Sequence, residues 1–407
     1  MLTYRRPSAA RIFALVFALV TGLTMVLGAM LSDAQAQTAG GYTFTKVADS
    51  VEDGFDPFSF GCAAINAPGD VAFRAGRLAP DGFNTIPGIY RANADGTLTT
   101  IAEDPKRFVT IGFNPSINDS GQVSFAASLD GGNKSDTEAI LRGDGRKLTT
   151  IASTTDEFDS FGFDTSINNS GEVAFRAELD EEFNFDEGLF SGSGAKKSVT
   201  THYLNSSDVT LDGQPARFVG EDSRPSINNL GDIAFTESIQ PDFDSGIFVG
   251  SEGTFRTIAE PDPDVFVEKP VLNDAGTVAF YRSVTEAGFQ VLELVTIDEG
   301  GALTVVADTR GGEFTSFGFR PPSINKFGDV AFHATLADGS SGIFVGSDPV
   351  ADRVIATGDT LDGATVLNLT FCEEGLSDSG ELAFVATLED TSTPEGVRMA
   401  VFRATPE

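Results

Sequence analysis

The feature that most constrains the fold is a short motif that recurs seven times along the chain. Its consensus is Asn-x-x-Gly-x-Val-Ala-Phe, and residues 168–175 read Asn-Asn-Ser-Gly-Glu-Val-Ala-Phe. A repeat of about 50 residues with β-type content is typical of propeller blades, because solenoid coils have shorter turns. The copies are centred on Asn66, Asn118, Asn168, Asn228, Asn273, Asn325 and Ser377.

The motif itself predicts a hairpin turn followed by a buried strand. An Asn, Asp or Ser at the first position of a type I turn can bond the backbone ahead of it, and a glycine at the fourth position adopts the left-handed conformation at little cost. The Val-Ala-Phe stretch that follows is apolar on both faces, as expected of a strand between stacked sheets. The motif asparagines are therefore expected to be structural.

Two further strand patterns recur in most repeats. One is the Gly-Ile-Phe-Val type seen at 246–249, and the other is the Leu-Thr-Val-Val-Ala type seen at 303–307. Together with the motif strand and the short segment before each motif Asn, they give four strands per repeat. The sequence thus predicts an all-β, seven-bladed β-propeller with four antiparallel strands per blade.

The two ends of the repeat array are complementary. The seventh repeat stops after its third strand, at Met399–Phe402, and residues 42–48 resemble a fourth strand that lacks its first three. We therefore expect the N-terminal strand to complete the last blade and close the ring, which removes the exposed sheet edges. The predicted domain covers residues 42–405, after a short linker at 37–41.

The first 36 residues resemble a signal peptide. Arg5, Arg6 and Arg11 precede an apolar run over residues 12–31, and Ala34-Gln35-Ala36 is a small-x-small site that a signal peptidase can cleave. We expect cleavage after residue 36 and an exported protein, periplasmic or extracellular. Because the apolar run is long for a signal peptide, an uncleaved membrane anchor is the alternative.

The charge balance excludes some partners. The chain has 60 acidic and 27 basic residues, a formal net charge of −33. Such acidity repels phosphate backbones and anionic membranes and keeps a protein soluble. We expect no nucleic-acid partner, no membrane insertion after signal cleavage, and a monomer whose partner is a protein or a glycan.

Only two cysteines are present, and they occupy nearly equivalent places in the first and seventh repeats. Cys62 lies four residues before its motif Asn, and Cys372 lies five before Ser377. These repeats are neighbours only if the ring closes, and an exported protein favours disulfides. A Cys62–Cys372 disulfide is therefore predicted, with two buried free thiols as the alternative.

One column of residues stands at the start of each inner strand, four residues before the motif Asn. In the sixth repeat this place holds a proline, and the neighbouring arginine is taken instead. We predict that the column lines one mouth of the channel and forms a ligand site. Its members are Asn114, Asp164, Arg224, Lys269, Arg320 and Glu373.

Three consecutive members of this column are bases, in a chain that has few. A cluster of bases at a concave mouth would focus the field on an anionic ligand, so Arg224, Lys269 and Arg320 form a candidate cationic patch. The competing interpretation is that they pair with acids nearby in the sequence. Those acids are Glu221, Asp222 and Glu268.

A second recurrent pattern, Phe-x-x-Phe-Gly-Phe, precedes the inner strand. It occurs at residues 158–163 and 314–319, with a looser form at 108–113. We expect these rings to stack between blades in the place of the tryptophan that the chain lacks. An aromatic platform for sugars is the weaker interpretation, because such platforms favour Trp and Tyr.

The sequence indicates no catalytic residues, no metal site and no cofactor. The two histidines, His202 and His333, have no nucleophile near them in the pattern, and with only two His and two Cys in the chain we expect no His/Cys zinc site. Acidic loops at 184–188 and 242–246 suggest calcium only faintly, because both lack the EF-hand spacing.

The repeats resemble the Asn-x-x-Gly-x-Val-Ala-Phe tandem repeats of secreted or surface-anchored bacterial proteins of unknown function. The resemblance covers residues 42–403 and implies an exported propeller, but no catalytic residue. We therefore expect a non-catalytic binding or scaffold propeller that recognises a protein or glycan through one mouth of the ring. The alternative is an extracytoplasmic carbohydrate-active hydrolase or lyase that uses carboxylates at the channel mouth.

Overall fold

The structure is a computed structural model, and its strands lie within Gln37–Glu407. The expected signal peptide lies outside the described residues. Within the described part of the chain, no helix is long and apolar enough to cross a membrane. The described residues are 37–39, 41–79, 84–132, 135–180, 186–194, 199–220, 224–241 and 243–407.

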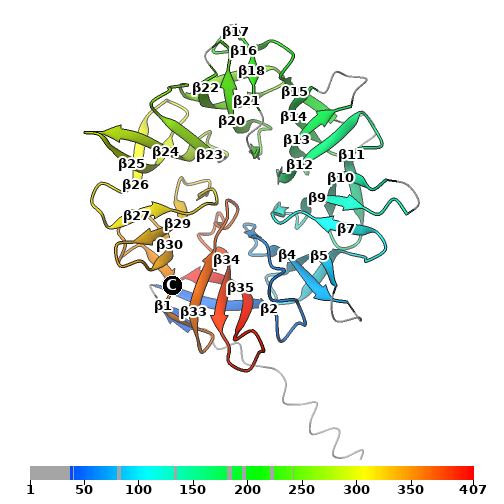
Figure 1. Ribbon diagram of the computed structural model, residues 1–407, viewed down its shortest axis with the longest axis vertical. Coiled ribbons are helices and arrows are strands. Elements are labelled where there is room, and N and C mark those ends of the chain that lie inside the picture. Colours follow the sequence, from blue (N-terminus) through cyan, green and yellow to red (C-terminus); the bar gives the residue numbers. More distant parts are fainter. Residues whose placement is uncertain are drawn as a thin grey trace, which may run out of the picture. The chain divides into compact units, whose positions relative to one another are not determined.

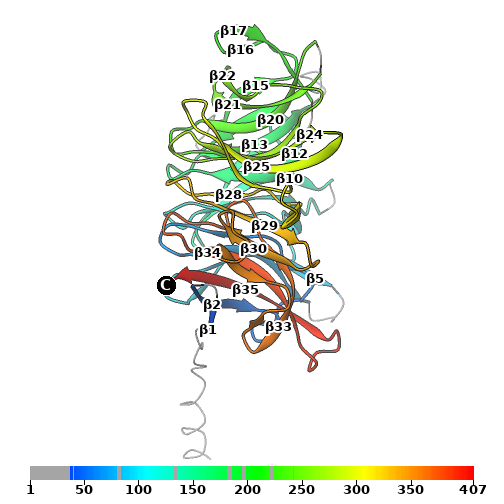
Figure 2. The ribbon, with the colours of Figure 1, turned by 90° about the vertical axis from the view of Figure 1, so that its left-hand side faces the viewer.

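The described residues form strands and no helix, and the strands make seven sheets. Figure 1 shows the sheets following one another in chain order around a common centre, the arrangement of a β-propeller. Figure 2 gives the same unit from the side. The repeats thus correctly predict an all-β propeller. We number the sheets first to seventh in the order in which their motif strands occur.

The first three sheets are regular. The first contains β3(Ala63–Ile65), β4(Val71–Leu78), β5(Thr85–Ala92) and β6(Leu98–Glu103). The second contains β7(Phe108–Ile111), β8(Ser116–Ile117), β9(Val123–Leu129), β10(Thr137–Gly143) and β11(Leu148–Ser153). The third contains β12(Phe158–Ile167), β13(Val173–Leu179), β14(Glu187–Gly192) and β15(Val199–Leu204).

The fourth sheet carries an additional hairpin, and the fifth has four strands. The fourth contains β16(Val209–Leu211), β17(Gln214–Ala216), β18(Phe218–Val219), β19(Ser226–Ile227), β20(Ile233–Ile239), β21(Ser245–Ser251) and β22(Thr254–Ala259). The fifth contains β23(Phe266–Leu272), β24(Val278–Glu286), β25(Phe289–Ile297) and β26(Leu303–Asp308).

The last two sheets include the strands at the beginning of the described chain. The sixth contains β27(Phe314–Phe317), β28(Ser323–Ile324), β29(Val330–Leu336), β30(Ser341–Val345) and β31(Arg353–Ala356). The seventh contains β1(Gln37–Ala39), β2(Tyr42–Asp49), β32(Thr360–Leu361), β33(Ala364–Thr370), β34(Leu382–Glu389) and β35(Val397–Pro406).

The prediction of four antiparallel strands per repeat needs two corrections. In the second, fourth and sixth sheets the inner strand is interrupted, so that β7 and β8, for example, both pair with β9. In the fourth sheet, β16 pairs with β22 in parallel. The first break lies at Gly112, where a Cβ atom would stand 2.9 Å from the carbonyl oxygen of Phe163. Close approach of the neighbouring backbone therefore bends the strand there.

The core consists of apolar layers between consecutive sheets. The motif phenylalanine of each repeat is at most 1% exposed, as expected of a strand covered on both faces. One layer joins the seventh sheet to the first, since Val385 and Val401 pack in the same cluster as Phe73 and Tyr90. The motif phenylalanines are Phe73, Phe125, Phe175, Phe235, Phe280, Phe332 and Phe384.

The motif asparagines are buried and bond in two directions. In the third repeat, the Asn168 Oδ1 accepts hydrogen bonds from the backbone N–H of Ser170 (3.1 Å) and Glu172 (3.0 Å), which fixes the turn. Its Nδ2 donates to the carbonyl oxygen of Asn228 in the next sheet, at 3.3 Å. Equivalent links join Asn66 to Asn118 and Asn118 to Asn168. The motif asparagine thus connects neighbouring sheets as well as shaping its own turn.

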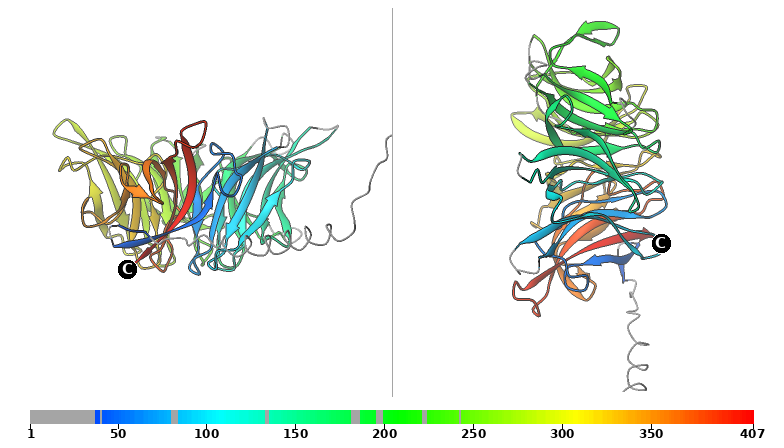
Figure 3. Two further views of the ribbon diagram at one scale, coloured as in Figure 1. Left: turned by 90° about the horizontal axis from the view of Figure 1, so that it is seen from below. Right: turned by 90° about the vertical axis from the view of Figure 1, so that its right-hand side faces the viewer.

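Strand β2 pairs with strand β35 in antiparallel register over seven residue pairs, from Tyr42 with Pro406 to Asp49 with Ala400. The left view of Figure 3 shows the blue N-terminal strand beside the red C-terminal one. The structure also contains the expected Cys62–Cys372 disulfide, whose Cα atoms are 5.9 Å apart across 310 residues of sequence. Both contacts join the beginning of the described chain to its end.

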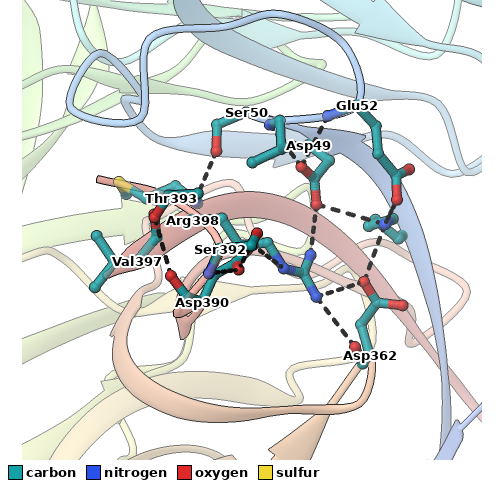
Figure 4. Close-up of polar contacts among 12 residues, drawn as sticks. Asp49, Ser50, Glu52, Asp362, Asp390, Ser392, Thr393, Val397 and Arg398 are labelled. Carbon is teal, nitrogen blue, oxygen red and sulfur yellow. Dashed lines mark hydrogen bonds and ion pairs between the residues drawn. The ribbon is translucent and has the colours of Figure 1, made fainter. Parts of the chain in front are cut away.

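A buried ion network lies at the same junction (Figure 4). Arg398 on β35 forms ion pairs with Asp49, at the end of β2, and with Asp362, in the turn between β32 and β33. The Asp49 side chain is 1% exposed, and Lys46 lies 3.4 Å from it. A buried carboxylate needs such partners to remain charged. The network therefore fixes the position of β2 against the other strands of the seventh sheet.

The asparagine links predict a graded loss of stability. Asn168→Ala removes the turn acceptor and the donor to the next sheet, and we expect the free energy of unfolding to fall by about 3 kcal/mol. Asn168→Ser should cost less, because at the seventh motif Ser377 Oγ accepts the equivalent bond from the Glu381 N–H at 3.1 Å. Denaturant unfolding followed by fluorescence of an extrinsic dye or by circular dichroism measures both values. Equal losses for the two variants would contradict the assigned role.

Candidate functional site

A cavity of about 490 Å³, whose opening we call the mouth, lies among strands and loops of the propeller. It is lined by residues of five sheets or of the loops that lead into them, from the third to the seventh. Its polar lining includes Asp164 on β12, Arg224 before β19, Lys269 on β23, Arg320 before β28 and Glu373 before β34. Five of the six residues predicted as a ligand site therefore line one cavity.

The sixth predicted residue, Asn114, lies beside the cavity and completes a network across the mouth. Its Nδ2 donates a hydrogen bond to Asp164 Oδ1 at 2.6 Å, and its Oδ1 accepts one from Arg320 at 3.2 Å. Arg320 precedes β28 of the sixth sheet, whereas Asn114 belongs to the second. We call Asn114, Asp164, Arg224, Arg320 and Glu373 the axial network.

Arg224 and Glu373 form the other crossing pair, an ion pair between the fourth and seventh sheets. Arg224 also lies 3.8 Å from Asp164. Burial lowers the pKa of Arg224, and Asp164 opposes that shift. Glu373 uses only its Oε1 in this pair: its side chain is 8% exposed, and its Oε2 has no hydrogen-bond partner in the described structure.

The three bases do not form an unpaired cationic patch. Lys269 bonds Glu268 at 2.9 Å, as the competing interpretation of the sequence anticipates, and Arg224 pairs with Glu373 from across the mouth. Glu221 and Asp222, the other acids proposed as partners, lie outside the described residues. The bases are thus brought together, but acids face two of them.

Glu374 is the residue of this site that the sequence analysis missed. It lies next to Glu373 and lines the cavity, and its carboxylate reaches the second sheet. Its Oε1 accepts a hydrogen bond from Ser116 Oγ at 2.6 Å, and its Oε2 accepts one from the backbone N–H of Ile117 at 3.1 Å. Its carbonyl oxygen accepts the N–H of Ile65 at 2.8 Å.

Glu374 supplies acceptors at two places where the inner strand lacks a serine. In four of the described sheets the serine before the motif Ile-Asn accepts a backbone N–H of the next sheet, as Ser116 does from Ile167 at 2.9 Å. The first sheet has Ala64 at that place, the fifth has Val271 and the seventh has Gly375, and none of these carries a hydroxyl. Glu374 supplies the acceptors for the first and seventh sheets, to Ile117 through its Oε2 and to Ile65 through its carbonyl oxygen. The sequence signal for this role was the absence of the serine at Ala64 and Gly375, which is a departure from the repeat and not a motif.

Burial raises the pKa of Glu374 to about 7, against the opposing effect of its hydrogen bonds with Ser116 and Ile117 and of the charge on Arg224. A buried carboxyl group loses its hydration, and these contacts replace only part of it. Glu374 therefore changes its charge near neutral pH while both of its oxygens hold the inner strands together.

Exposed phenylalanines surround the mouth, which corrects one expectation. In the Phe-x-x-Phe-Gly-Phe segments the first two rings pack between sheets, as expected: Phe158 and Phe161 lie 5.1 Å apart. The third ring does not. Phe163 and Phe319 are 72% and 86% exposed, and Phe266 on β23 is 61% exposed. In each of these segments the exposed third ring comes immediately before a residue of the axial network, Asp164 or Arg320.

Metal and histidine chemistry finds little support in the described residues. No group of three or more His, Cys, Asp or Glu side chains there is arranged to hold a metal ion. The acidic loops noted in the sequence fall partly outside the described residues. His202 is buried between Ser191 Oγ and the backbone N–H of Glu252, and burial lowers its pKa and that of His333.

This chain matches a known protein family. Residues 45–265 match the family described as "Family of unknown function (DUF7453)". The chain belongs to this family. No curated protein matches its sequence. Membership assigns no reaction and no ligand, so the geometry of the mouth carries the functional argument for this DUF7453 member.

Solved structures with the same fold are distant in sequence. The β-propeller domain of the Trilobed protease from Pyrococcus furiosus is 12% identical, with a TM-score of 0.53 over 86% of this chain and 93% of that one. The Pyrococcus horikoshii acylaminoacyl peptidase is 11% identical, with a TM-score of 0.50 over 84% of this chain and 52% of that one. At such identities the likeness shows the propeller fold alone.

Titration of Glu374 predicts how stability depends on pH. Because its pKa rises on folding from near 4.5 to about 7, the folded state holds the proton more tightly than the unfolded chain. The stability of the wild type should therefore fall as pH rises from about 4.5 to 7, by about 3 kcal/mol through this group. Glu374→Gln cannot titrate, so its stability relative to the wild type should improve over that interval.

Denaturant midpoints of the wild type and Glu374→Gln, measured from pH 4.5 to 8, test this. Glu299→Gln, at an exposed glutamate, is the matched control and should follow the wild type. A difference between Glu374→Gln and the wild type that stays constant with pH would contradict the assignment.

Proposed function

We propose that this protein is an exported, non-catalytic binding propeller that recognises a protein segment or a glycan through the mouth described above. One observation carries the proposal. The cavity combines a polar floor, assembled from several sheets, with exposed aromatic rings at its wall, and ligand sites typically have this composition. Most of its side chains come from inner strands or the turns before them, and β20 and β21 contribute the others.

The aromatic rings support binding because their exposure has a cost. Phe319 and Phe266 both line the cavity and leave most of their surface in water. Clustered exposed apolar groups on a soluble protein mark interaction sites more often than single ones do. A ligand that covered both rings would remove their apolar surface from water, which would contribute favourable hydrophobic free energy to binding.

The backbone at Lys269 gives independent support. Its φ of 58° lies in the left-handed region, which a residue with a Cβ atom seldom adopts. Strand β23 is irregular at this point, between Glu268 and Val271. The strain turns the Lys269 ammonium toward Phe319, whose ring centroid is 5.0 Å away. Strained backbone of this kind concentrates at functional sites.

Binding fits the carboxylates better than hydrolase or lyase chemistry does. Glu374 has the raised pKa of a general acid, but both of its oxygens already bond the inner strands. A general acid needs a proton within reach of the substrate. Glu373 has one free oxygen, and Arg224 holds the other. We therefore favour recognition over turnover.

The same proposal includes the ring and the compartment. We infer that the seven sheets are the blades of one ring, which the pairing of β2 with β35 and the apolar layer between the seventh and first sheets support. The Cys62–Cys372 disulfide supports an oxidising, extracytoplasmic location, where such bonds persist.

A binding screen with a matched pair of variants tests the function. Immobilised oligosaccharides and a phage-displayed random peptide library are the two probes, presented to the exported protein. Ligands enriched from either should bind Phe266→Ala/Phe319→Ala at least tenfold more weakly than the wild type, because the variant lacks the aromatic wall. Phe289→Ala, at an exposed ring on the first residue of β25, should bind normally.

Three results would overturn the proposal. These are no enrichment from either probe, equal affinity of the wild type and the double variant, and cleavage of an enriched ligand during the incubation.

A further inference from the structure

Two groups of opposite charge at the floor of the cavity have unused bonding capacity. From them we infer that the cavity binds a zwitterion, a free α-amino acid or a short unblocked peptide, with its ammonium on Glu373 and its carboxylate on Arg320. The inference rests on the proposed binding function and names the ligand class for that same mouth.

Glu373 is the acidic half of this pair. Its side chain is more than nine-tenths buried, and the Arg224 guanidinium takes only its Oε1. Its Oε2 is buried and has no hydrogen-bond donor in the described structure, and Glu373 is one of the residues that line the cavity. A buried carboxylate oxygen without a donor is costly, and an ammonium group, which has three N–H donors and a positive charge, would satisfy it.

Arg320 is the basic half. Its one hydrogen bond in the described structure goes to Asn114 Oδ1, at 3.2 Å, which is a neutral acceptor. A guanidinium has five N–H donors in a planar fork whose geometry matches a carboxylate. Arg320 therefore keeps both charge and donors for a ligand, whereas Lys269 is already bonded to Glu268.

Both groups adjoin one residue, Arg224. It forms the ion pair with Glu373, and the charge on Arg320 is close enough to contribute to lowering the pKa of Arg224. A ligand with only a negative charge would leave the free oxygen of Glu373 without a donor. A ligand with only a positive charge would be repelled by Arg320. A ligand that carries both charges close together matches the two groups at once.

The remaining walls suit an apolar side chain. Phe266 and Phe319 line the cavity, and an aromatic or aliphatic ligand side chain could pack against either ring. A volume of about 490 Å³ is in the range of small-molecule sites and exceeds what a single amino acid occupies. A dipeptide therefore also fits by size.

Calorimetric titration with a set of matched probes tests the inference. L-phenylalanine carries both charges, L-phenylalaninamide lacks the carboxylate, and N-acetyl-L-phenylalanine lacks the ammonium. We expect L-phenylalanine to bind at least tenfold more tightly than either blocked form. Phenylalanyl-glycine, with its two charges farther apart, shows by its affinity relative to L-phenylalanine whether the site prefers amino acids or short peptides.

Two variants assign each charge to its partner. Arg320→Gln should remove the preference for L-phenylalanine over its amide, and Glu373→Gln should remove the preference over the N-acetyl form. Arg146→Gln, at an exposed arginine in the turn between β10 and β11, should change neither. Because Glu373 pairs with Arg224, thermal melting verifies the fold of that variant, and Arg320→Gln tests the inference without touching this pair.

The results separate this inference from the proposed function. No binding of L-phenylalanine or of phenylalanyl-glycine, or equal affinity for the charged and blocked forms, would overturn the zwitterion. If the oligosaccharide or peptide screen still yields ligands that need the aromatic wall, the mouth remains a binding site of another class. Failure of both screens and titrations would overturn both.

Discussion

The pairing of β2 with β35 is the contact on which the rest of this structure depends. It joins the first regular strand of the described core to the last, and the ion network of Arg398 and the Cys62–Cys372 disulfide reinforce the same junction. The same junction includes the apolar layer that the seventh sheet shares with the first. Without this junction Glu374 could not supply acceptors to Ile65 and Ile117, and the mouth would lose one of its walls.

The mouth shows how a repeat can build a site without a catalytic motif. Each inner strand delivers one side chain at the same height, and the variation at this position, from Asn114 to Arg224 to Glu373, sets the chemistry. Charges that are far apart in sequence then meet across the axis, where burial strengthens their pairing. What the internal pairs leave unused, one carboxylate oxygen and one guanidinium, defines the polar part of the ligand that we propose.

Much of this was predictable from the sequence because the repeat fixes positions. The motif spacing places turns and buried strands, and the matched offsets of Cys62 and Cys372 anticipate the disulfide. The ion-pair partners of the site residues were not predictable, because residues that are distant in sequence meet around the centre of the propeller. Arg224, for example, pairs with Glu373, 149 residues away. Glu374 was not predicted because it acts at two of the three repeats that lack the serine, and no motif marks it. The exposure of Phe319 depends on a bend after Gly318 that periodicity does not encode.

Mapping the disulfide in protein purified without reducing agent tests the central claim, that the two ends of the described chain meet, most directly. Digestion without reduction, followed by mass spectrometry, should yield one cross-linked pair of peptides that contain Cys62 and Cys372. Reduction should separate them and release two thiols. Two free thiols in protein recovered from an oxidising compartment would contradict the closed junction, and with it the mouth that Glu373 and Glu374 help to build.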